Sequence, residues 1–150
     1  VHQIGRYAGR RLAYPIGILT ALAAYRTVPV EIRVDGAAQR IPRLTNLIVA
    51  NGQYFGRGLR PAPQARPDDG LLDVVLMTDL SAVEIARRFP ELKNGPPAGD
   101  PKVRTLRGRR IEILAPEGVL VEADGEVLGS CPASFEVVER ALRVVAPAPA

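Results

Sequence analysis

The sequence predicts a mainly β domain of the α+β class: an antiparallel two-layer β-sandwich of short strands, with an N-terminal helix and one short mid-chain helix. Apolar and polar residues alternate cleanly in “RIEIL” and “VLVEADGE”, which indicates strands with one buried face. Turn signals recur about every eight to twelve residues in the second half, as in an antiparallel sandwich. Aromatic residues make up only 5% of the chain, so the core must be mostly aliphatic.

The first half contains one helix and several strands by periodicity. Apolar residues at helical spacing predict a helix from Gly9 to Arg26, kinked at Pro15. The stretch “VPVEIRV” alternates with period two, and Asp35-Gly36 predicts a hairpin turn to a strand near Arg40–Leu44. The run “TNLIVANG” that follows is continuously apolar and predicts a further strand, buried on both faces.

A long loop, “QYFGRGLRPAPQARPDDG”, leads into the second half; loops of this length are functional or disordered. After it, “LLDVVLMT” predicts a strand, and “LSAVEIARRF” predicts a short helix in which Ser81 and Glu84 have capping-box spacing. Further strands are expected in “KVRTLRG”, “RRIEILA”, “VLVEADGEVLG”, “ASFEVVE” and “ALRVVAP”. We expect residues 147–150 to be a disordered tail.

Composition excludes several kinds of chemistry. The single Cys131 rules out an internal disulfide framework and a cysteine-based zinc site, and it favours a reducing compartment such as the cytoplasm. The only histidine is His2, so any proton-accepting side chain is expected to be a carboxylate. The stretch “LAYPIGILTALAAY” is too short to span a bilayer. The chain starts without an initiator Met and reads as part of something longer.

The net charge of +4 is unevenly distributed. Residues 1–70 carry ten arginines against four acidic residues (+6), whereas residues 71–150 carry ten basic and twelve acidic residues (−2). A basic half suits phosphate ligands, anionic lipid headgroups or nucleic acid, and a solvated arginine-rich surface is the simpler alternative. The few Tyr and Phe residues do not interleave with the basic ones, so we do not expect a nucleic-acid partner.

Three motifs could carry chemistry. In “NGQYFGRGLRPAP”, glycines permit positive φ while arginines suit phosphate oxygens, although a structural cluster of turns explains the pattern equally well. In “RPDDGLLD”, Asp68 and Asp69 indicate either a turn or a hydrated cation site with one carboxylate and backbone carbonyls. In “VEADGEVLG”, Asp124 and Glu126 flank Gly125, as in an ordinary hairpin or a pair of catalytic carboxylates.

In this order, the motifs resemble the C-terminal domain of the bacterial diacylglycerol kinase family, which includes the sphingosine-kinase-like lipid kinases. The resemblance is carried by residues 51–58, “RPAPQARPDDGLLDVV”, “LRGRRIEI”, “ADGE” and “FEVVERALRVVAP”. It spans roughly residues 30–146 and identifies residues 1–146 as a lipid kinase C-terminal domain.

The resemblance implies a larger enzyme in which a nucleotide-binding α/β domain and this β-sandwich enclose the active site. Such an enzyme transfers the γ-phosphoryl group of ATP to a lipid hydroxyl, as in diacylglycerol. The resemblance makes Glu126 the proton acceptor, supported by Asp124, and assigns a structural Mg²⁺ to the Asp69 carboxylate and the backbone carbonyls of Arg66 and Leu71. The cofactor-binding residues that it implies are Asn51, Gly52, Gly56, Arg57 and Gly58.

The chain departs from the family in two places. It reads Gly56-Arg57-Gly58 where three glycines are common, and the nucleotide-binding sequence Gly-Gly-Asp-Gly-Thr occurs nowhere in the 150 residues. We therefore expect the nucleotide-binding domain to be a missing partner that binds most of the ATP, and this chain alone to be inactive. The enzyme would be cytoplasmic and peripheral to the membrane that holds its lipid substrate, and homodimerisation stays open.

A second hypothesis belongs to another functional class. In it, the chain is a non-catalytic β-domain that binds anionic lipid or a membrane surface through its arginine-rich half. The sequence does not choose among diacylglycerol, phosphatidylglycerol and sphingoid bases as acceptor.

Overall fold

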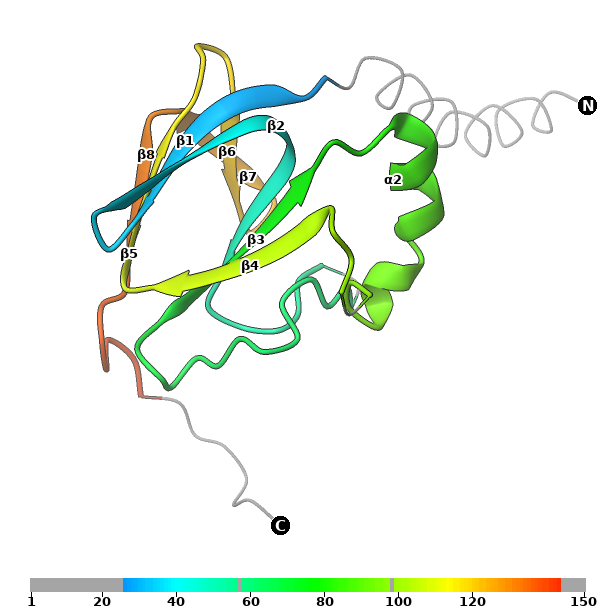
Figure 1. The fold of residues 1–150 in the computed structure, drawn as a ribbon. Coiled ribbons are helices and arrows are strands. Elements are labelled where there is room, and N and C mark those ends of the chain that lie inside the picture. The colour runs from blue at the N-terminus through cyan, green and yellow to red at the C-terminus, as the bar shows by residue number, and fades with distance from the viewer. Residues whose placement is uncertain (1–25, 57, 98, 144–150) are drawn as a thin grey trace, which may run out of the picture.

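The computed structural model describes residues 26–56, 58–97 and 99–143, which form mainly antiparallel β-structure (Figure 1). One sheet has six strands in the order β4-β3-β2-β1-β5-β8, and β6 and β7 form a separate two-stranded ribbon. The strands are β1 (Val28–Val34), β2 (Ala37–Ala50), β3 (Leu72–Thr78), β4 (Val103–Gly108), β5 (Arg110–Leu114), β6 (Leu120–Ala123), β7 (Glu126–Ser130) and β8 (Ala133–Glu136). Helix α2 (Ala82–Arg88) and the short 3₁₀ helix η1 (Glu91–Lys93) lie between β3 and β4. The predicted fold class is confirmed.

A one-residue connection between β4 and β5 forces the sheet to curl. Three strands lie between β4 and β5 in the sheet order, so a flat sheet would separate them by about 19 Å, at about 4.8 Å per step. Only Arg109 joins them, and the chain from Gly108 to Arg110 spans at most about 7 Å. The sheet therefore bends round until β4 approaches β5, as Figure 1 shows at the lower left.

Curling encloses a main core and leaves a second, smaller core on the outer face. The main core is formed by the inward residues of β1, β2, β3 and β5: Val30, Ile32, Ile41, Leu44, Leu72, Val74, Leu76, Ile111 and Ile113. The smaller core joins Ala50, Val75 and Met77 to loop residues Ala62 and Ala65 and to Leu80. Because successive residues of β3 point alternately into the two cores, six of its seven residues are buried.

The structure corrects the prediction for β2. The sequence indicated a strand near 40–44 and another in 45–52, but residues 37–50 form one strand with two irregularities in register. Pro42 lies in the first irregularity, where two residues of β2 oppose one of β1, so its missing N–H breaks no regular pairing. The expectation that 45–52 is buried on both faces is wrong as well. The doubly buried strand is β3, because the loop before it and the helices after it cover its outer face.

The other expected elements lie mostly where periodicity placed them. Helix α2 begins after Ser81, whose hydroxyl accepts the Glu84 N–H at 3.3 Å, while the Glu84 carboxylate accepts the Ser81 N–H at 2.9 Å. The strand expected in “ALRVVAP” is wrong for residues 141–143, and its remainder, like the expected helix before Arg26 and the tail 147–150, lies outside the described residues. No helix in the described part of the chain has the length and hydropathy of a membrane span.

The corner between β4 and β5 leaves no room for a side chain at Gly108. A β-carbon there would lie 2.5 Å from Val34 Cγ1 and 2.9 Å from Asp35 Oδ2. The Asp35 carboxylate also stabilises the corner, because its other oxygen, Oδ1, accepts the N–H groups of Arg109 and Arg110, each at 2.9 Å. The close approach of the β1–β2 turn to this corner therefore depends on glycine.

We expect Gly108→Ala to lower the free energy of unfolding by about 1–3 kcal/mol, the usual cost of overpacking. Urea unfolding followed by circular dichroism measures the change. Gly52→Ala is the matched control, since a β-carbon at Gly52 would meet no atom within 4 Å. Equal stability of the two variants would contradict the steric argument.

Candidate functional site

An apolar pocket of about 390 Å³ lies between the outer face of the sheet and the helical segment after β3. Its walls come from β2, the loop that follows β2, the end of β3, and the segment from α2 to β4. The apolar lining includes Ile48, Phe55, Leu59, Met77, Leu80, Ile85, Phe89 and Leu92. A pocket of this size is typical of small-molecule sites, and its aliphatic and aromatic walls suit a hydrocarbon ligand.

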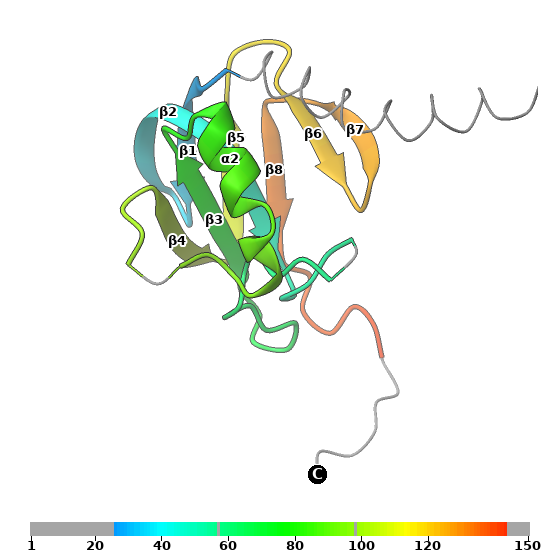
Figure 2. The ribbon, with the colours of Figure 1, turned by 90° about the vertical axis from the view of Figure 1, so that its right-hand side faces the viewer.

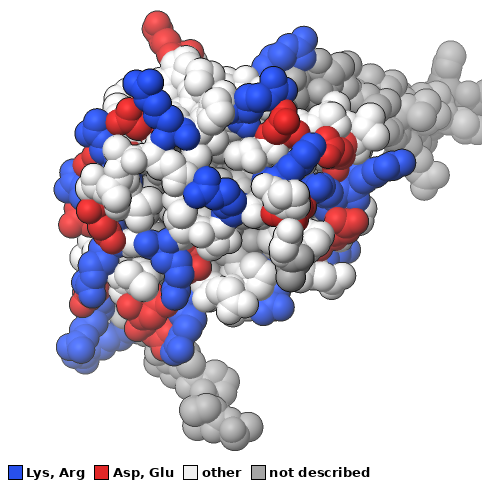
Figure 3. All heavy atoms as spheres, viewed as in Figure 1, with Lys and Arg blue, Asp and Glu red and all other residues white. Residues whose placement is uncertain are grey.

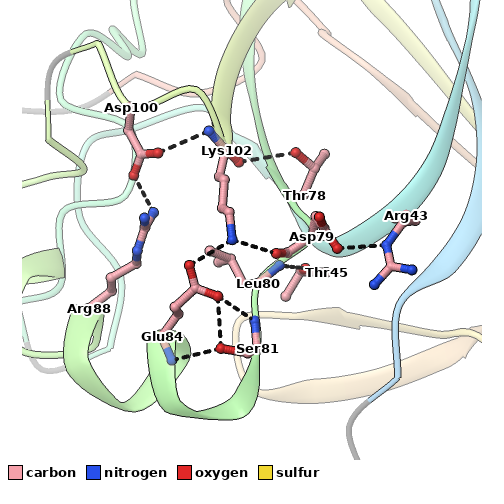
Figure 4. Close-up of polar contacts among 10 residues, drawn as sticks. All are labelled: Arg43, Thr45, Thr78, Asp79, Leu80, Ser81, Glu84, Arg88, Asp100 and Lys102. Atoms are coloured by element: carbon pink, nitrogen blue, oxygen red, sulfur yellow. Dashed lines mark hydrogen bonds and ion pairs between the residues drawn. The ribbon is translucent and has the colours of Figure 1, made fainter.

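Charged contacts, rather than buried side chains, hold α2 over this pocket (Figure 4). Lys102 donates from Nζ to Glu84 at 2.6 Å and to the backbone carbonyl of Asp79 at 2.8 Å. Arg88 in the last turn of α2 is ion-paired with Asp100, which also accepts the Lys102 N–H at 2.9 Å. Since α2 has no fully buried residue, these contacts add to the packing of the partly buried Ile85 against the smaller core.

The glycine-rich loop folds as a tight turn that supplies part of the pocket wall. Phe55 and Leu59 form an isolated bridge, with backbone N–H to carbonyl distances of 3.0 and 3.1 Å. Gly56 and Gly58 have φ values of 54° and 80°, which side chains disfavour. The described residues of this loop therefore form a turn, whose two sides, Phe55 and Leu59, both line the pocket.

The polar residues of this loop are placed only in part. Asn51 is exposed directly after β2, next to Gly52. Arg60 lies over the Tyr54 ring, 5.5 Å from its centroid, and donates to the side-chain oxygen Oε1 of Gln53 at 2.7 and 3.1 Å, so its guanidinium has protein partners. Arg57, expected to contact phosphate, lies outside the described residues.

The two adjacent aspartates are each paired with a different arginine. Asp68 accepts from Arg66 Nε at 3.2 Å, and this contact lowers the pKa of the Asp68 carboxyl. Asp69 Oδ1 accepts the Leu71 N–H at 3.0 Å, while Oδ2 is ion-paired with Arg107 of β4. Two arginines and one backbone amide therefore offset the electrostatic repulsion between the neighbouring carboxylates of Asp68 and Asp69.

Arg107 also contacts Asp73, which is buried at the start of β3 with only 1% of its surface exposed. Arg107 Nε lies 3.3 Å from Asp73 Oδ1 and 3.4 Å from Oδ2, yet Oδ1 accepts no hydrogen bond among the described residues. The oxygens of Asp69 and of the nearby carbonyls are of the kind that Mg²⁺ prefers. The described residues contain no group of three or more His, Cys, Asp or Glu side chains able to hold a metal. A cation held by Asp69 would share that carboxylate with Arg107.

The acidic pair lies at the exposed turn of the β6–β7 hairpin. Asp124 and Gly125 have φ values of 50° and 93°, which is typical of a two-residue hairpin turn, and Glu126 is the first residue of β7. Both carboxylates are exposed and make no hydrogen bond within the described residues. Figure 2 shows the hairpin standing beside β8. The structure thus presents the two acids on one projecting turn without a partner that would assign either a role.

The distribution of charge gives little support to a continuous basic patch. Acidic and basic side chains are interspersed on the face shown in Figure 3. Arginines of the basic half are paired, Arg33 with Glu31, Arg43 with Asp79 and Arg66 with Asp68. Burial raises the pKa of the Cys131 thiol, so this cysteine lacks the thiolate character of a nucleophile.

Together these features define a β-domain that offers an apolar ligand pocket beside a glycine-rich turn, with an acidic hairpin exposed at the surface. The model of the YegS C-terminal NAD kinase β-sandwich-like domain matches residues 2–146. The chain therefore belongs to the family of YegS C-terminal NAD kinase β-sandwich-like domains.

Individual relatives agree with this assignment. The chain is 31% identical over 142 residues to the diacylglycerol kinase of Mycobacterium tuberculosis (strain H37Rv), covering 95% of this chain and 46% of the relative. It is 35% identical over 100 residues to a probable lipid kinase YegS-like of Pseudomonas aeruginosa (strain PAO1), covering 67% and 32%. A putative diacylglycerol kinase from Bacillus anthracis str. Sterne has a similar fold, with a TM-score of 0.63 at 23% identity, covering 81% and 42%. The chain spans less than half the length of these relatives.

Sequence reasoning missed the pocket and the role of Arg107. The pocket is assembled from segments between Thr45 and Val103, and none of them carries a local motif for apolar binding. Arg107 was quoted only as part of “LRGRRIEI”, because its contacts with Asp69 and Asp73 depend on the pairing of β3 with β4. The one usable signal was Asp73 itself, a carboxylate within an apolar strand, which requires a cationic partner.

Glu84 makes the attachment of α2 sensitive to acid. Its hydrogen bonds with Lys102 and Ser81 lower the pKa of Glu84 from 4.5 to about 2. A lowered folded-state pKa stabilises the protein above the unfolded value, and the contribution is lost as pH falls through the folded value. We expect the difference in unfolding free energy between wild type and Glu84→Gln to be constant above about pH 4.5 and to shrink toward pH 2.

Chemical denaturation at a series of pH values measures this difference. Glu117→Gln, at an exposed loop position, serves as the control and should show no such pH dependence. A Glu84→Gln effect that stays the same down to pH 2 would contradict the assigned contacts.

Proposed function

We propose that this chain is the lipid-binding and proton-accepting domain of an ATP-dependent lipid kinase. The observation that carries the proposal is the apolar pocket of about 390 Å³ under α2, in a chain whose relatives are named as diacylglycerol and lipid kinases. Hydrocarbon walls with few polar atoms suit an acyl chain, which leaves the hydroxyl end of the lipid outside the pocket for reaction.

The acidic hairpin supplies the proton acceptor in this proposal. Glu126 accepts the proton of the lipid hydroxyl as that oxygen attacks the γ-phosphorus of ATP, and Asp124 supports it from the same turn. Exposure of both carboxylates on a projecting turn is consistent with a site completed by a second domain, which would bind most of the nucleotide. The part of this chain that would contact the nucleotide is formed by Asn51, Gly52 and the turn around Gly56 and Gly58.

A bound Mg²⁺ would stabilise the loop and neutralise charge near the phosphates. The oxygens that would hold it are the Asp69 carboxylate and the carbonyls of Arg66 and Leu71. Arg107 compensates Asp69 in the absence of the ion, so ion binding would weaken the Arg107–Asp69 pair.

The alternative, a non-catalytic domain that binds anionic lipid through its arginine-rich half, has less support. Arg33, Arg43 and Arg66 of that half are paired with acidic side chains. Those pairs leave less positive charge for headgroups than the sequence suggested.

The catalytic part is tested by lipid phosphorylation with radiolabelled ATP and Mg²⁺. The chain is assayed alone and joined to a nucleotide-binding domain, taken from the preceding gene sequence or from the M. tuberculosis relative. We expect activity only in the joined form, and a fall in kcat of about 10²–10⁴ with Glu126→Gln, the usual effect of losing a general base.

The matched control is Glu122→Gln, an exposed carboxylate on β6 of the same hairpin, which should leave kcat unchanged. In the joined form, Ile85→Asp places a charge in the pocket wall and should raise KM for the lipid. Full activity of Glu126→Gln would remove the assigned base. No activity toward diacylglycerol, phosphatidylglycerol or sphingosine would remove the kinase assignment.

The cation site is tested without catalysis. We expect Mg²⁺ to raise the thermal unfolding midpoint of the chain and to have no effect on Asp69→Asn, because a ligand that binds only the folded state stabilises it. Asp68→Asn, whose carboxylate pairs with Arg66, should keep the response. A Mg²⁺ response that survives in Asp69→Asn would place the ion elsewhere.

A further inference from the structure

Helix α2 and its neighbours expose apolar side chains, two of which also line the pocket. Phe55 and Phe89 line the pocket, yet 48% and 55% of their surfaces are exposed. Val83, on the outward side of α2, is 64% exposed. Val83 and the two phenylalanines thus leave apolar surface exposed on and beside α2, and grouped apolar surface of this kind marks contact sites.

Two basic residues without partners accompany these apolar side chains. Arg87 lies one turn after Val83 on α2, and Lys93 ends η1. Both are exposed and make no ion pair within the described residues, whereas Arg88 and Lys102 are neutralised by Asp100 and Glu84. Glu91 is the one acidic side chain of α2 and η1 that no described residue neutralises, so the free charge of the two helices is positive.

We propose that Phe55, Val83, Arg87, Phe89 and Lys93, together the α2 rim, contact the surface of an anionic lipid bilayer. Apolar and aromatic side chains beside unpaired cations are the combination by which interfacial helices bind membranes. Two of the five residues, Phe55 and Phe89, line the pocket, so a bilayer that contacts them would bring its acyl chains next to the pocket. The assignment of the pocket to an acyl chain rests on the proposed function, whereas contact of the rim with a membrane does not require phosphoryl transfer.

This surface differs from the one that composition suggested. The arginine excess of residues 1–70 pointed to the first half of the chain, but four of the five rim residues belong to residues 83–93. A protein partner could also cover the aromatic residues, but the apolar pocket that Phe55 and Phe89 line favours a partner made of hydrocarbon chains.

The absence of tryptophan from the sequence allows a direct test. Phe89→Trp introduces the sole tryptophan, which is excited selectively beside the four tyrosines, into the rim. Val138→Trp introduces one at a position that is 75% exposed and does not line the pocket. Each chain is titrated with vesicles of phosphatidylglycerol and phosphatidylcholine, and with phosphatidylcholine alone, without ATP. We expect a blue shift of the Phe89→Trp emission with the anionic vesicles and none for Val138→Trp.

The charges are tested in the Phe89→Trp background. Arg87→Gln with Lys93→Gln should weaken binding roughly 25-fold, because each basic residue at an anionic surface contributes about a factor of five. Neither residue lines the pocket, so the pocket itself is unchanged. Arg40→Gln is the control, since this arginine is 90% exposed but lies on β2 away from the pocket. Circular dichroism confirms that each variant is folded.

Three outcomes would overturn the proposal: no blue shift for Phe89→Trp, an equal shift for Val138→Trp, or an equal loss with Arg40→Gln. Failure of the rim and failure of the kinase are distinguishable. If the joined form phosphorylates detergent-dispersed lipid but Phe89→Trp shows no blue shift with vesicles, the membrane contact of the rim is contradicted and the kinase assignment is not. If Phe89→Trp shows the blue shift but the joined form phosphorylates no lipid, the membrane contact is supported and the kinase assignment is contradicted.

Discussion

The closure of the sheet between β4 and β5 is the constraint on which the other features depend. A single residue joins two strands that the sheet order separates by three others, so the sheet must curl. Asp35 holds the corner through two backbone amides, and Gly108 allows the turn of β1 and β2 to approach it. Curling gives the sheet an enclosed inner face, where the main core forms, and an outer face that is free to build a second site.

Burial of β3 on both faces follows from this arrangement and connects the core to the pocket. Val74 and Leu76 pack inside the curl, while Val75 and Met77 face the smaller core and the pocket floor. The second residue of the same strand, Asp73, contacts Arg107, which is also ion-paired with Asp69. The apolar pocket and the charged loop before β3 are therefore positioned by opposite ends of one rigid element.

Local features of the sequence were predicted well, and features made by distant pairing were not. The capping box at Ser81 and the alternation around Ile111 are encoded within a few residues, so α2 and β5 could be placed. The continuity of β2 could not, because the apolar run that starts after Leu44 suggested a separate strand, whereas Thr45 lies in a register irregularity within one strand.

The candidate site shows the same division. Glycines and adjacent acids identified its loops, but the pocket needs four separate segments and the Arg107 contacts need the pairing of β3 with β4. The role of the two carboxylates in the β6–β7 hairpin is the hardest feature to predict, because neither has a partner within the described residues.

The order of the strands also has a consequence for how the chain folds. Strands β1 to β4 form a meander in which each pairs with its neighbour along the chain, whereas β1 pairs with β5 by bringing Glu31 opposite Leu114. The β1–β2 hairpin forms at small entropic cost, whereas the pairing of Glu31 with Leu114 closes a longer loop than any pairing within the meander. We expect the meander to form first and closure to follow. Until then the inner face of β3 is open to other copies, so a folding intermediate of this domain is most exposed to aggregation along the face that the finished curl conceals.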